Sequence, residues 1–281
     1  MELLNRNITN PVTRPIKVVQ FGEGNFLRGF VDYMIDIANE QGKFDGSIVL
    51  VKPIEFGNLE NFHKQDCQYT VSLRGRIDGE GRIINRRITS VCDAVDSYTE
   101  YEKYMGLAEI DTTEAGIVFD DTDRFELDPP KTFPGKLTKF LYHRYKTFQG
   151  DLSKGLVMLP VELIDDNGIM LHKCVLQLID LWGLGDNFKN WVEEACIFTS
   201  TLVDRIITGY PKATEEAEWE NLGYIDRCLV TGEPFALWVI ESAKDISREL
   251  PLPDAGLPVI YTDNQKPYKQ RKVRILNGAH T

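Results

Sequence analysis

Three polar side chains near the end of the sequence have types and a spacing that could perform chemistry. If Tyr268 to Thr281 forms a helix with about 100° per residue, Lys272, Asn277 and His280 fall on one arc together with two apolar residues. Buried polar groups cost free energy unless they have partners or take part in chemistry. Such side chains can donate hydrogen bonds, and lysine and histidine can also exchange protons. The pattern therefore predicts a reactive face on this helix.

Each of the three residues also has an ordinary structural explanation. Lys272 lies in a basic run with Lys269, Arg271 and Arg274, which would suit a solvated helix face. A single histidine such as His280 is more often a structural residue with satisfied hydrogen bonds. It is the three residues together that favour chemistry.

The element best suited to hold a cofactor for such chemistry lies near the start of the chain. Ile16 to Phe21 is a short apolar run that leads directly into Gly22-Glu23-Gly24, and a periodic segment then continues to about Glu40. A strand, a glycine turn and a helix open a dinucleotide-binding βαβ unit. Gly22 would make the tight turn, and Gly24 would let the backbone approach a pyrophosphate at the helix N-terminus. An ordinary strand–helix turn explains the segment equally well, because Leu27 replaces the third glycine of the usual pattern.

The second strand bears on the choice between NAD and NADP. It is expected over Ser47 to Val51, and the acidic residue that often follows it to bind the adenosine ribose is replaced by Lys52-Pro53. Lys52 could accommodate a 2′-phosphate, so NADP is not excluded. A solvated lysine before a proline turn is the alternative.

The remaining patterns predict an α/β fold with a Rossmann-like, mostly parallel sheet and an inserted β-hairpin around Asp78-Gly79. Glu162 would lie at the carboxyl end of a buried strand, where open α/β sheets place ligand groups, although a capping or turn carboxylate is equally expected there. The strands and helices on which this prediction rests are a hairpin of 68–73 and 82–89, helices at 98–107, 134–148, 169–182 and 212–221, and strands at 155–163, 235–240 and 258–262.

Composition indicates an ordinary globular protein and excludes some partners. Hydrophobic residues make up 42% of the 281 residues and charged residues 27%. The net charge of −11, with no basic stripe, argues against a nucleic-acid partner. The sequence shows no membrane-spanning run and no signal peptide, so a cytoplasmic location is expected.

The cysteine and histidine content gives no support for a metal site. The five cysteines, Cys67, Cys92, Cys174, Cys196 and Cys228, are scattered, odd in number and never form C-x-x-C. With four histidines and no H-E-x-x-H motif, no catalytic metal is expected.

The C-terminal pattern Lys272-x4-Asn277-x2-His280 resembles the active-site helix of the polyol-specific long-chain dehydrogenases, the mannitol dehydrogenase family. Further segments that resemble this family are GEGNFLRGF at 22–30, TTEAG at 112–116, PGKLT at 134–138, STLVDRIITGYP at 200–211 and KPYKQRKVRILNGAHT at 266–281. The resemblance extends from about Ile16 to Thr281. It implies hydride transfer between NAD(H) and a secondary alcohol or ketone of an open-chain sugar acid, in which tagaturonate is reduced to altronate.

The resemblance also implies roles for individual residues. Lys272 would be the general acid/base, and Asn277 and His280 would donate hydrogen bonds to the developing oxyanion or to the substrate hydroxyls. Glu162 and Arg205 are assigned to the substrate. The residues assigned to the cofactor are Gly22, Glu23, Gly24, Asn25, Phe26, Arg28, Thr113 and Glu114.

One position departs from the family pattern. The mannitol-oxidising members have a further asparagine just after the central strand, where this chain has Val161-Glu162-Leu163. Asn167 is a possible substitute.

The domain prediction places an NAD-binding domain at 1–265 and the first helix of a helical substrate domain at 266–281, which the chain contains only in part. Oligomeric state is left open. Fructuronate reductase and mannitol 2-dehydrogenase activities are the alternatives within the family, and a nucleotide-binding module without turnover is the alternative from another class.

Overall fold

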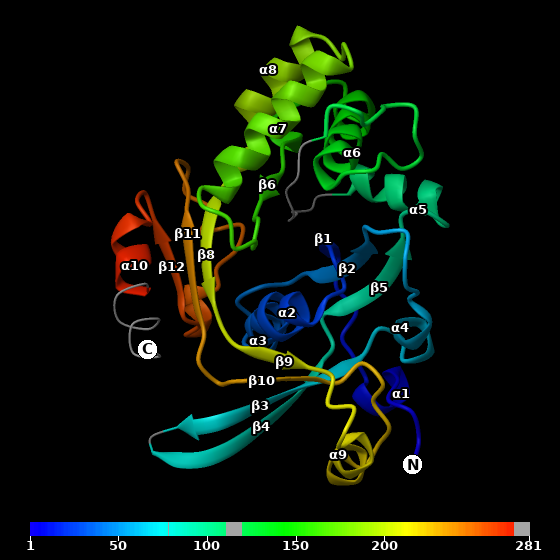
Figure 1. Ribbon diagram of the computed structural model, residues 1–281, viewed down its shortest axis with the longest axis vertical. Coiled ribbons are helices and arrows are strands. Elements are labelled where there is room, and N and C mark those ends of the chain that lie inside the picture. Colours follow the sequence, from blue (N-terminus) through cyan, green and yellow to red (C-terminus); the bar gives the residue numbers. More distant parts are fainter. Residues whose placement is uncertain (78, 111–119, 273–281) are drawn as a thin grey trace. The chain divides into compact units, whose positions relative to one another are not determined.

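The computed structural model describes residues 1–77, 79–110 and 120–272, and the chain divides into two compact units (Figure 1). Unit 1 comprises Met1–Thr112 and Arg205–Ala236, and unit 2 comprises Thr113–Asp204 and Leu237–Thr281. The chain therefore passes between the units three times, and each unit is assembled from segments that are distant in the sequence.

Unit 1 contains the parallel sheet that the N-terminal pattern predicts. Its strands are β1 (Ile16–Phe21), β2 (Ser47–Lys52) and β5 (Val91–Asp96), in the order β1-β2-β5, and both pairings are parallel. All six residues of β2 are buried, which explains why its sequence is apolar without alternation. The carboxyl end of β1 opens directly into the glycine turn.

A nearly continuous helix connects β1 to β2. It consists of α2 (Asn25–Leu27), the π-helical segment η1 (Arg28–Asp32) and α3 (Tyr33–Glu40). Phe30, Met34 and Ala38 on this helix are at most 1% exposed. Their spacing of four residues gives the helix one buried apolar stripe.

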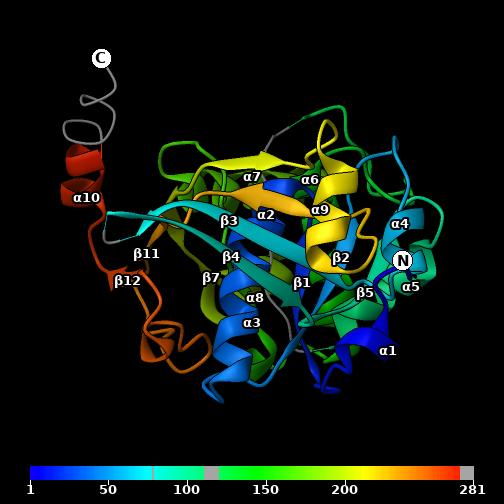
Figure 2. The same ribbon diagram turned by 90° about the horizontal axis from the view of Figure 1, so that it is seen from below.

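The second sheet of unit 1 contains the predicted hairpin. β3 (Tyr69–Ile77) and β4 (Glu80–Ile88) pair antiparallel along their whole length. The sheet order is β4-β3-β10-β9, with β9 (Ile207–Gly209) and β10 (Val230–Gly232) returning late in the sequence. Figure 2 shows the hairpin as a long ribbon with β10 beside β3. The remaining helices of unit 1 are α1 (Arg6–Thr9), α4 (Glu60–Lys64), α5 (Tyr101–Gly106), η2 (Leu107–Glu109) and α9 (Glu215–Leu222).

The helices of unit 2 form a small cluster in which α6 (Phe133–Thr147), α7 (Asn167–Leu181) and α8 (Asp186–Ala195) pack together. The start of α6 is set locally, because Thr132 Oγ1 accepts a hydrogen bond from the Gly135 amide at 3.1 Å. A short turn, η3 (Leu152–Lys154), follows α6.

The strands of unit 2 form two sheets. β6 (Val157–Met158) and β7 (Ile197–Phe198) pair parallel, and the other sheet has the order β12-β11-β8. β8 (Ser200–Asp204) is antiparallel to β11 (Leu237–Glu241), whereas β12 (Val259–Thr262) is parallel to it. The turn η4 (Pro253–Ala255) precedes β12, and α10 (Lys266–Arg271) follows it.

The structure confirms the Rossmann-like α/β class and the inserted hairpin, and it adds antiparallel pairs that the sequence did not predict. The strand expected over 155–163 is shorter, since its ladder ends at Met158. Pro160 has no N–H to continue a ladder, and its carbonyl accepts hydrogen bonds from the side chains of Asn167 and Thr201 instead. Of the helix predicted over 266–281, α10 covers Lys266–Arg271, and residues 273–281 lie outside the described part of the chain, so the helical domain stays a prediction.

Candidate active site

The glycine turn of unit 1 requires glycine at its first position. Gly22 has φ of +127°, and its amide donates to the Val51 carbonyl at 2.9 Å, which ties the turn to the end of β2. A Cβ at this position would lie 2.8 Å from Leu27 Cδ1. The positive φ therefore requires glycine here, and a larger residue would also have to displace the Leu27 methyl group.

Gly24 satisfies a different condition. Its backbone has the ordinary values φ −66° and ψ 158°, and it precedes the helix with no side chain capping the first turn. A Cβ built on Gly24 meets no atom within 4 Å. The first amides of a helix have no partner within the helix and attract anions. This open helix start fits the pyrophosphate of a dinucleotide, as the sequence predicts.

Arg28 stabilises the turn through hydrogen bonds from within the protein. Its side chain is buried, and its guanidinium donates to the Glu23 carbonyl at 2.9 Å, to Asn25 Oδ1 at 2.7 Å and to the Cys228 carbonyl at 2.5 Å. Its Cζ atom also lies 5.2 Å from the ring centroids of Phe62 and Tyr69. Arg28 thus connects Glu23 and Asn25, and a direct contact of any of these residues with a cofactor stays a prediction.

Lys52 is buried, so the expectation of a solvated lysine is wrong. Its ammonium donates to the carbonyls of Ile54 at 2.5 Å and Glu55 at 3.3 Å, and it pairs with Asp96 at 3.1 Å. A lysine ammonium has three N–H donors. Because the loop after β2 and Asp96 already engage this group, Lys52 is poorly placed to accept a 2′-phosphate.

Arg205 belongs to unit 1, where it joins the helix after the glycine turn to the segment before β11. The guanidinium is buried and donates to the carbonyls of Gly29 at 2.8 Å, Pro234 at 3.0 Å and Phe235 at 3.0 Å. It also lies 4.9 Å from the ring centroid of Tyr33. Burial lowers the pKa of Arg205. Its described contacts are structural, and its assignment to a substrate carboxylate stays a prediction.

Lys272 lies in unit 2, directly after α10. Its ammonium donates to the Val203 carbonyl at 2.7 Å and lies 3.4 Å from Asp204 Oδ1, so it is held at the carboxyl end of β8. The Lys272 and Asp204 side chains are 17% and 21% exposed, which leaves the pair partly accessible. A protonated amine held by a carboxylate and a carbonyl is a suitable proton donor for a neighbouring oxygen.

The residue that sequence reasoning missed is Asp204. It lies within the 200–211 segment that resembles the family, but no local pattern singles out this aspartate. The only signal is its place at the end of a short apolar strand, Ser200–Asp204. Its pairing with Lys272 joins positions 68 residues apart and follows only from the tertiary structure.

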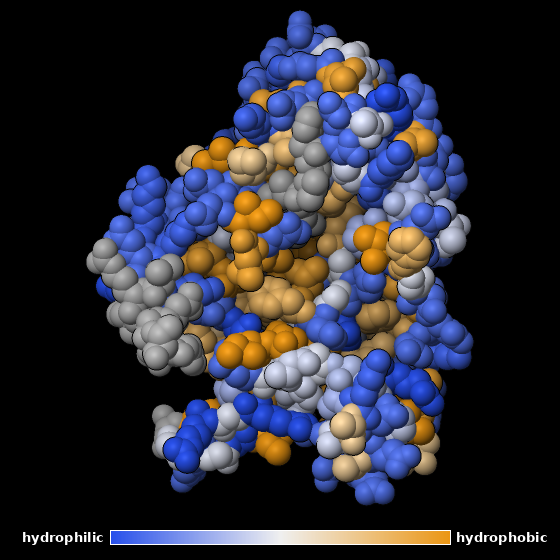
Figure 3. Space-filling model, viewed as in Figure 1, coloured by the Kyte–Doolittle hydropathy of each residue, from blue (hydrophilic) through white to orange (hydrophobic). Residues whose placement is uncertain are grey.

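The segment between β6 and α7 also contacts α10. Lys269 on α10 forms an ion pair with Asp165 in this segment. Glu162 lies here as well, beyond the end of β6, and its carbonyl accepts from Asn167 Nδ2 at 3.0 Å. Leu163 is 83% exposed, and Figure 3 shows apolar atoms at the surface over this segment. The assignment of Glu162 to the substrate stays a prediction.

Asn167 acts as a clamp, so its side chain is not an open oxyanion donor. Nδ2 donates to the carbonyls of Pro160, Glu162 and Thr201, at 3.1, 3.0 and 3.2 Å. Oδ1 accepts from the amides of Gly168 at 2.9 Å and Thr201 at 2.8 Å. The fully buried side chain thus fastens the segment after β6 to β8.

Replacing Asn167 with alanine is expected to lower the free energy of unfolding by about 1–3 kcal/mol, because buried backbone groups lose their partners. Urea denaturation would measure the change. The matched control is Asn221→Ala on the exposed face of α9, where we expect a change within about 0.5 kcal/mol. Equal effects of the two substitutions would contradict the clamp.

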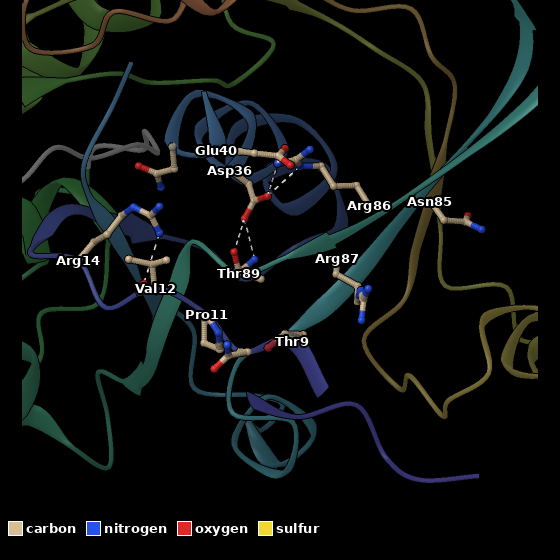
Figure 4. A pocket seen from close by; sticks show the side chains of 12 residues that line it. Thr9, Pro11, Val12, Arg14, Asp36, Glu40, Asn85, Arg86, Arg87 and Thr89 are labelled. Atoms are coloured by element: carbon tan, nitrogen blue, oxygen red, sulfur yellow. Dashed lines mark hydrogen bonds and ion pairs between the residues drawn. The ribbon is translucent and has the colours of Figure 1, made fainter. Parts of the chain in front are cut away.

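A cavity of about 540 Å³ in unit 1 lies at the opposite edge of the parallel sheet from the glycine turn. Figure 4 shows that it lies between the segment before β1, the end of α3 and the end of β4. Its most buried charge, Asp36, accepts from Arg86 Nε at 2.8 Å and from the Thr89 amide at 2.7 Å. Open α/β sheets bind ligands at the carboxyl ends of their strands. We therefore interpret this cavity as structural.

Four predicted site residues lie outside the described part of the chain, namely Asn277, His280, Thr113 and Glu114. Of the others, the structure brings Gly22, Glu23, Gly24, Asn25, Phe26 and Arg28 together in the turn of unit 1, with Arg205 bonded to the same helix. Lys272 and Glu162 lie in unit 2.

Within the described ranges, no helix is both long and apolar enough to cross a membrane.

The chain is similar to known proteins over most of its length. The family model described as the mannitol dehydrogenase Rossmann domain matches residues 16–253. Altronate oxidoreductases of Phocaeicola vulgatus and Bacillus subtilis are each 45% identical to the chain; both alignments cover 100% of the chain and 60% of the relative. The chain thus spans about 60% of the length of these curated relatives.

Two solved structures share the fold. The ternary complex of Pseudomonas fluorescens mannitol 2-dehydrogenase with NAD and D-mannitol superposes with a TM-score of 0.77 at 21% identity, over 100% of this chain and 62% of that one. A substrate-free D-sorbitol dehydrogenase gives the same TM-score and identity, over 99% of this chain and 62% of its own. The family match over most of the chain, together with this fold, shows that the chain belongs to the mannitol dehydrogenase family and contains its Rossmann domain.

Proposed function

We propose that the chain is the nucleotide-binding part of an NAD-dependent oxidoreductase that reduces tagaturonate to altronate, reversibly. The observation that carries the proposal is Lys272, whose ammonium is held by the Val203 carbonyl and the Asp204 carboxylate in a chain with an open glycine turn. The choice of substrate is supported by the altronate oxidoreductases at 45% identity.

The glycine turn is proposed to bind the dinucleotide. Gly24 offers open space in front of the helix start, and Gly22 gives the turn its shape. When bound, the nicotinamide supplies or accepts the hydride. Arg28 keeps Glu23 and Asn25 in place through its hydrogen bonds, so that the helix amides face the pyrophosphate in a fixed arrangement.

Lys272 is proposed to transfer the proton. In the reductive direction its ammonium donates a proton to the ketone oxygen, and in the oxidative direction the neutral amine accepts the proton of the alcohol. Asp204 holds the lysine in position through the ion pair. Asn277 and His280 are proposed to donate hydrogen bonds to the oxygen as negative charge develops on it.

A substrate panel tests this function. The complete natural protein is incubated with NADH and one substrate at a time, which is tagaturonate, fructuronate or fructose. The oxidation of NADH is followed by absorbance. We expect the highest kcat/KM for tagaturonate. A preference for fructuronate or fructose would show that the substrate is a different one, although the reaction is the same. NADH binding without turnover of any of the three substrates would contradict the assignment as an enzyme.

The buried Lys52 leads to a prediction about cofactor choice. Because its ammonium is engaged by loop carbonyls and Asp96, we expect NADH to be preferred to NADPH. Titration of the protein fluorescence with each nucleotide would measure the two Kd values. Replacement of Lys52 by methionine should weaken the fold without changing this preference. A variant that loses NADPH binding alone would show that Lys52 contacts a 2′-phosphate after all.

A further inference from the structure

A buried carboxyl group lies beneath the glycine turn without an ion-pair partner among the described residues. Asp32, in η1, is 0% exposed. Its Oδ2 accepts from the Tyr69 hydroxyl at 2.5 Å and from Gln20 Nε2 at 3.4 Å, whereas Oδ1 has no partner among the described residues. Among the residues that the structure describes, no ion pair joins Asp32 to a cation. A buried ionised carboxylate in this setting would be costly.

Gln20 also has a buried side-chain oxygen that lacks a hydrogen-bond donor among the described residues. Its Nε2 donates to the Gly22 carbonyl at 3.1 Å, while its buried Oε1 has no donor among the described residues. Turning the amide over would place two oxygens against each other at the Gly22 carbonyl, so this orientation is required. The side chains of Gln20 and Asp32 therefore contain two buried acceptor atoms without a donor among the described residues. A proton on Asp32 Oδ1 would turn one of these two acceptors into a donor.

The charges around Asp32 agree with a bound proton. Burial raises the pKa of Asp32 to about 7, and the negative charge of Asp36 on α3 acts in the same direction. The hydrogen bonds from Tyr69 on β3 and Gln20 on β1, together with the positive charge of Arg28, lower the pKa but do not restore its ordinary value.

Two separate paths lead from Asp32 to the carbonyls of the turn. Gln20 connects it to the Gly22 carbonyl. Tyr69, whose hydroxyl donates to Asp32, has its ring centroid 5.2 Å from the Arg28 guanidinium, and Arg28 donates to the Glu23 carbonyl. The protonation of Asp32 is therefore linked to two consecutive residues of the turn.

We propose that Asp32 is held as a neutral carboxylic acid and is a positioning residue for the glycine turn, so that loss of its proton weakens dinucleotide binding. The proposal rests on the proposed function in that it takes the turn as the dinucleotide site. It adds that the proton on Asp32 helps to position that site. Asp32 acts on the cofactor only through Gln20 and Arg28.

The first test measures NADH affinity against pH in the complete protein. If NADH binding raises the Asp32 pKa by half a unit to one unit, the wild-type Kd should rise about threefold to tenfold between pH 6 and pH 8, because one pKa unit corresponds to a factor of about ten. Asp32→Asn places an amide donor where the acid proton would be, so its Kd should stay near the wild-type value at pH 6 and change less than about twofold over the range. A wild-type Kd that does not depend on pH would overturn the positioning role.

The second test needs no cofactor. Infrared difference spectra of the wild type minus Asp32→Asn at pH 6 should contain the carbonyl stretch of a protonated carboxylic acid, and this band should disappear above pH 8. Tyr69→Phe keeps the ring beneath Arg28 but removes a hydrogen bond that lowers the Asp32 pKa, so the midpoint should move to higher pH. Absence of the acid band, or a midpoint that moves down in Tyr69→Phe, would refute the neutral acid.

These results also distinguish the inference from the proposed function. If the acid band is present but the wild type binds no NADH at any pH, the proposed function fails and the positioning role fails with it, while the proton on Asp32 stands. If the wild type binds and oxidises NADH but Asp32→Asn behaves like the wild type at every pH, only the further inference fails.

Discussion

Replacing Lys272 with alanine in the complete protein is expected to lower kcat for ketone reduction by about 10²- to 10⁴-fold, because the proton donor at the end of β8 is lost. NADH affinity should stay nearly unchanged, since the described contacts of Lys272 are with Val203 and Asp204 and not with the glycine turn that we propose for the cofactor. Stopped-flow measurement of NADH oxidation with tagaturonate, together with fluorescence titration of NADH, would separate the two effects.

The matched substitution is Asp204→Asn, which removes the charge of the partner but preserves its shape. We expect a smaller loss of kcat, because the Val203 carbonyl still holds the ammonium at 2.7 Å. Lys269→Ala on the neighbouring turn of α10 serves as the control for loss of a surface lysine, and it should leave turnover within about twofold of the wild type. Near-normal turnover in Lys272→Ala would refute the role of the lysine.

The second large effect is expected at the glycine turn. Gly22→Ala places a Cβ on a backbone with φ of +127° and within 2.8 Å of Leu27 Cδ1. Such backbone strain costs about 1–3 kcal/mol, and we expect the free energy of unfolding to fall by that amount. Because the turn must deform to relieve the strain of this φ, NADH affinity should fall about tenfold or more. Denaturant unfolding and NADH titration would measure the two changes.

Gly24→Ala is the partner experiment, because it separates folding from binding. The residue has an ordinary φ of −66°, and its Cβ would meet nothing within 4 Å. Stability should therefore change by less than about 0.5 kcal/mol, whereas NADH affinity should fall because the methyl group occupies space needed by the ligand. A Gly24→Ala protein that binds NADH as tightly as the wild type would show that the pyrophosphate does not approach this glycine.

Unfolding free energy should also depend on pH through Asp32. Its pKa is about 7 in the native state and near its ordinary value of 3.8 in the unfolded chain, so the native state binds more protons between these values. The contribution of Asp32 to stability is therefore fully present below pH 4 and is lost as pH rises through 7. The difference in stability between the wild type and Asp32→Asn, measured by urea denaturation from pH 4 to pH 8, should become more unfavourable to the wild type as pH rises.

Local sequence patterns were sufficient to predict the elements whose conformation depends mainly on neighbouring residues. The apolar run of β2 is buried throughout, the hairpin around 78 and 79 pairs antiparallel, and the glycine turn follows β1 as expected. In these cases the turn residues and the apolar period determine the local structure, and tertiary contacts agree with them. The strand expected over 155–163 was the exception, since Pro160 ended its ladder.

The sequence by itself determined that a glycine turn follows an apolar strand and that Lys272 has the spacing of a reactive lysine. Only the tertiary structure decided what surrounds these groups. It placed Asp204 beside Lys272, enclosed Lys52 among carbonyls, and left one oxygen of the buried Asp32 without a hydrogen-bond partner among the described residues. The physical reason is that turn geometry acts between neighbours, whereas hydrogen bonds, ion pairs and burial depend on which distant segments meet. That is decided only when the chain packs.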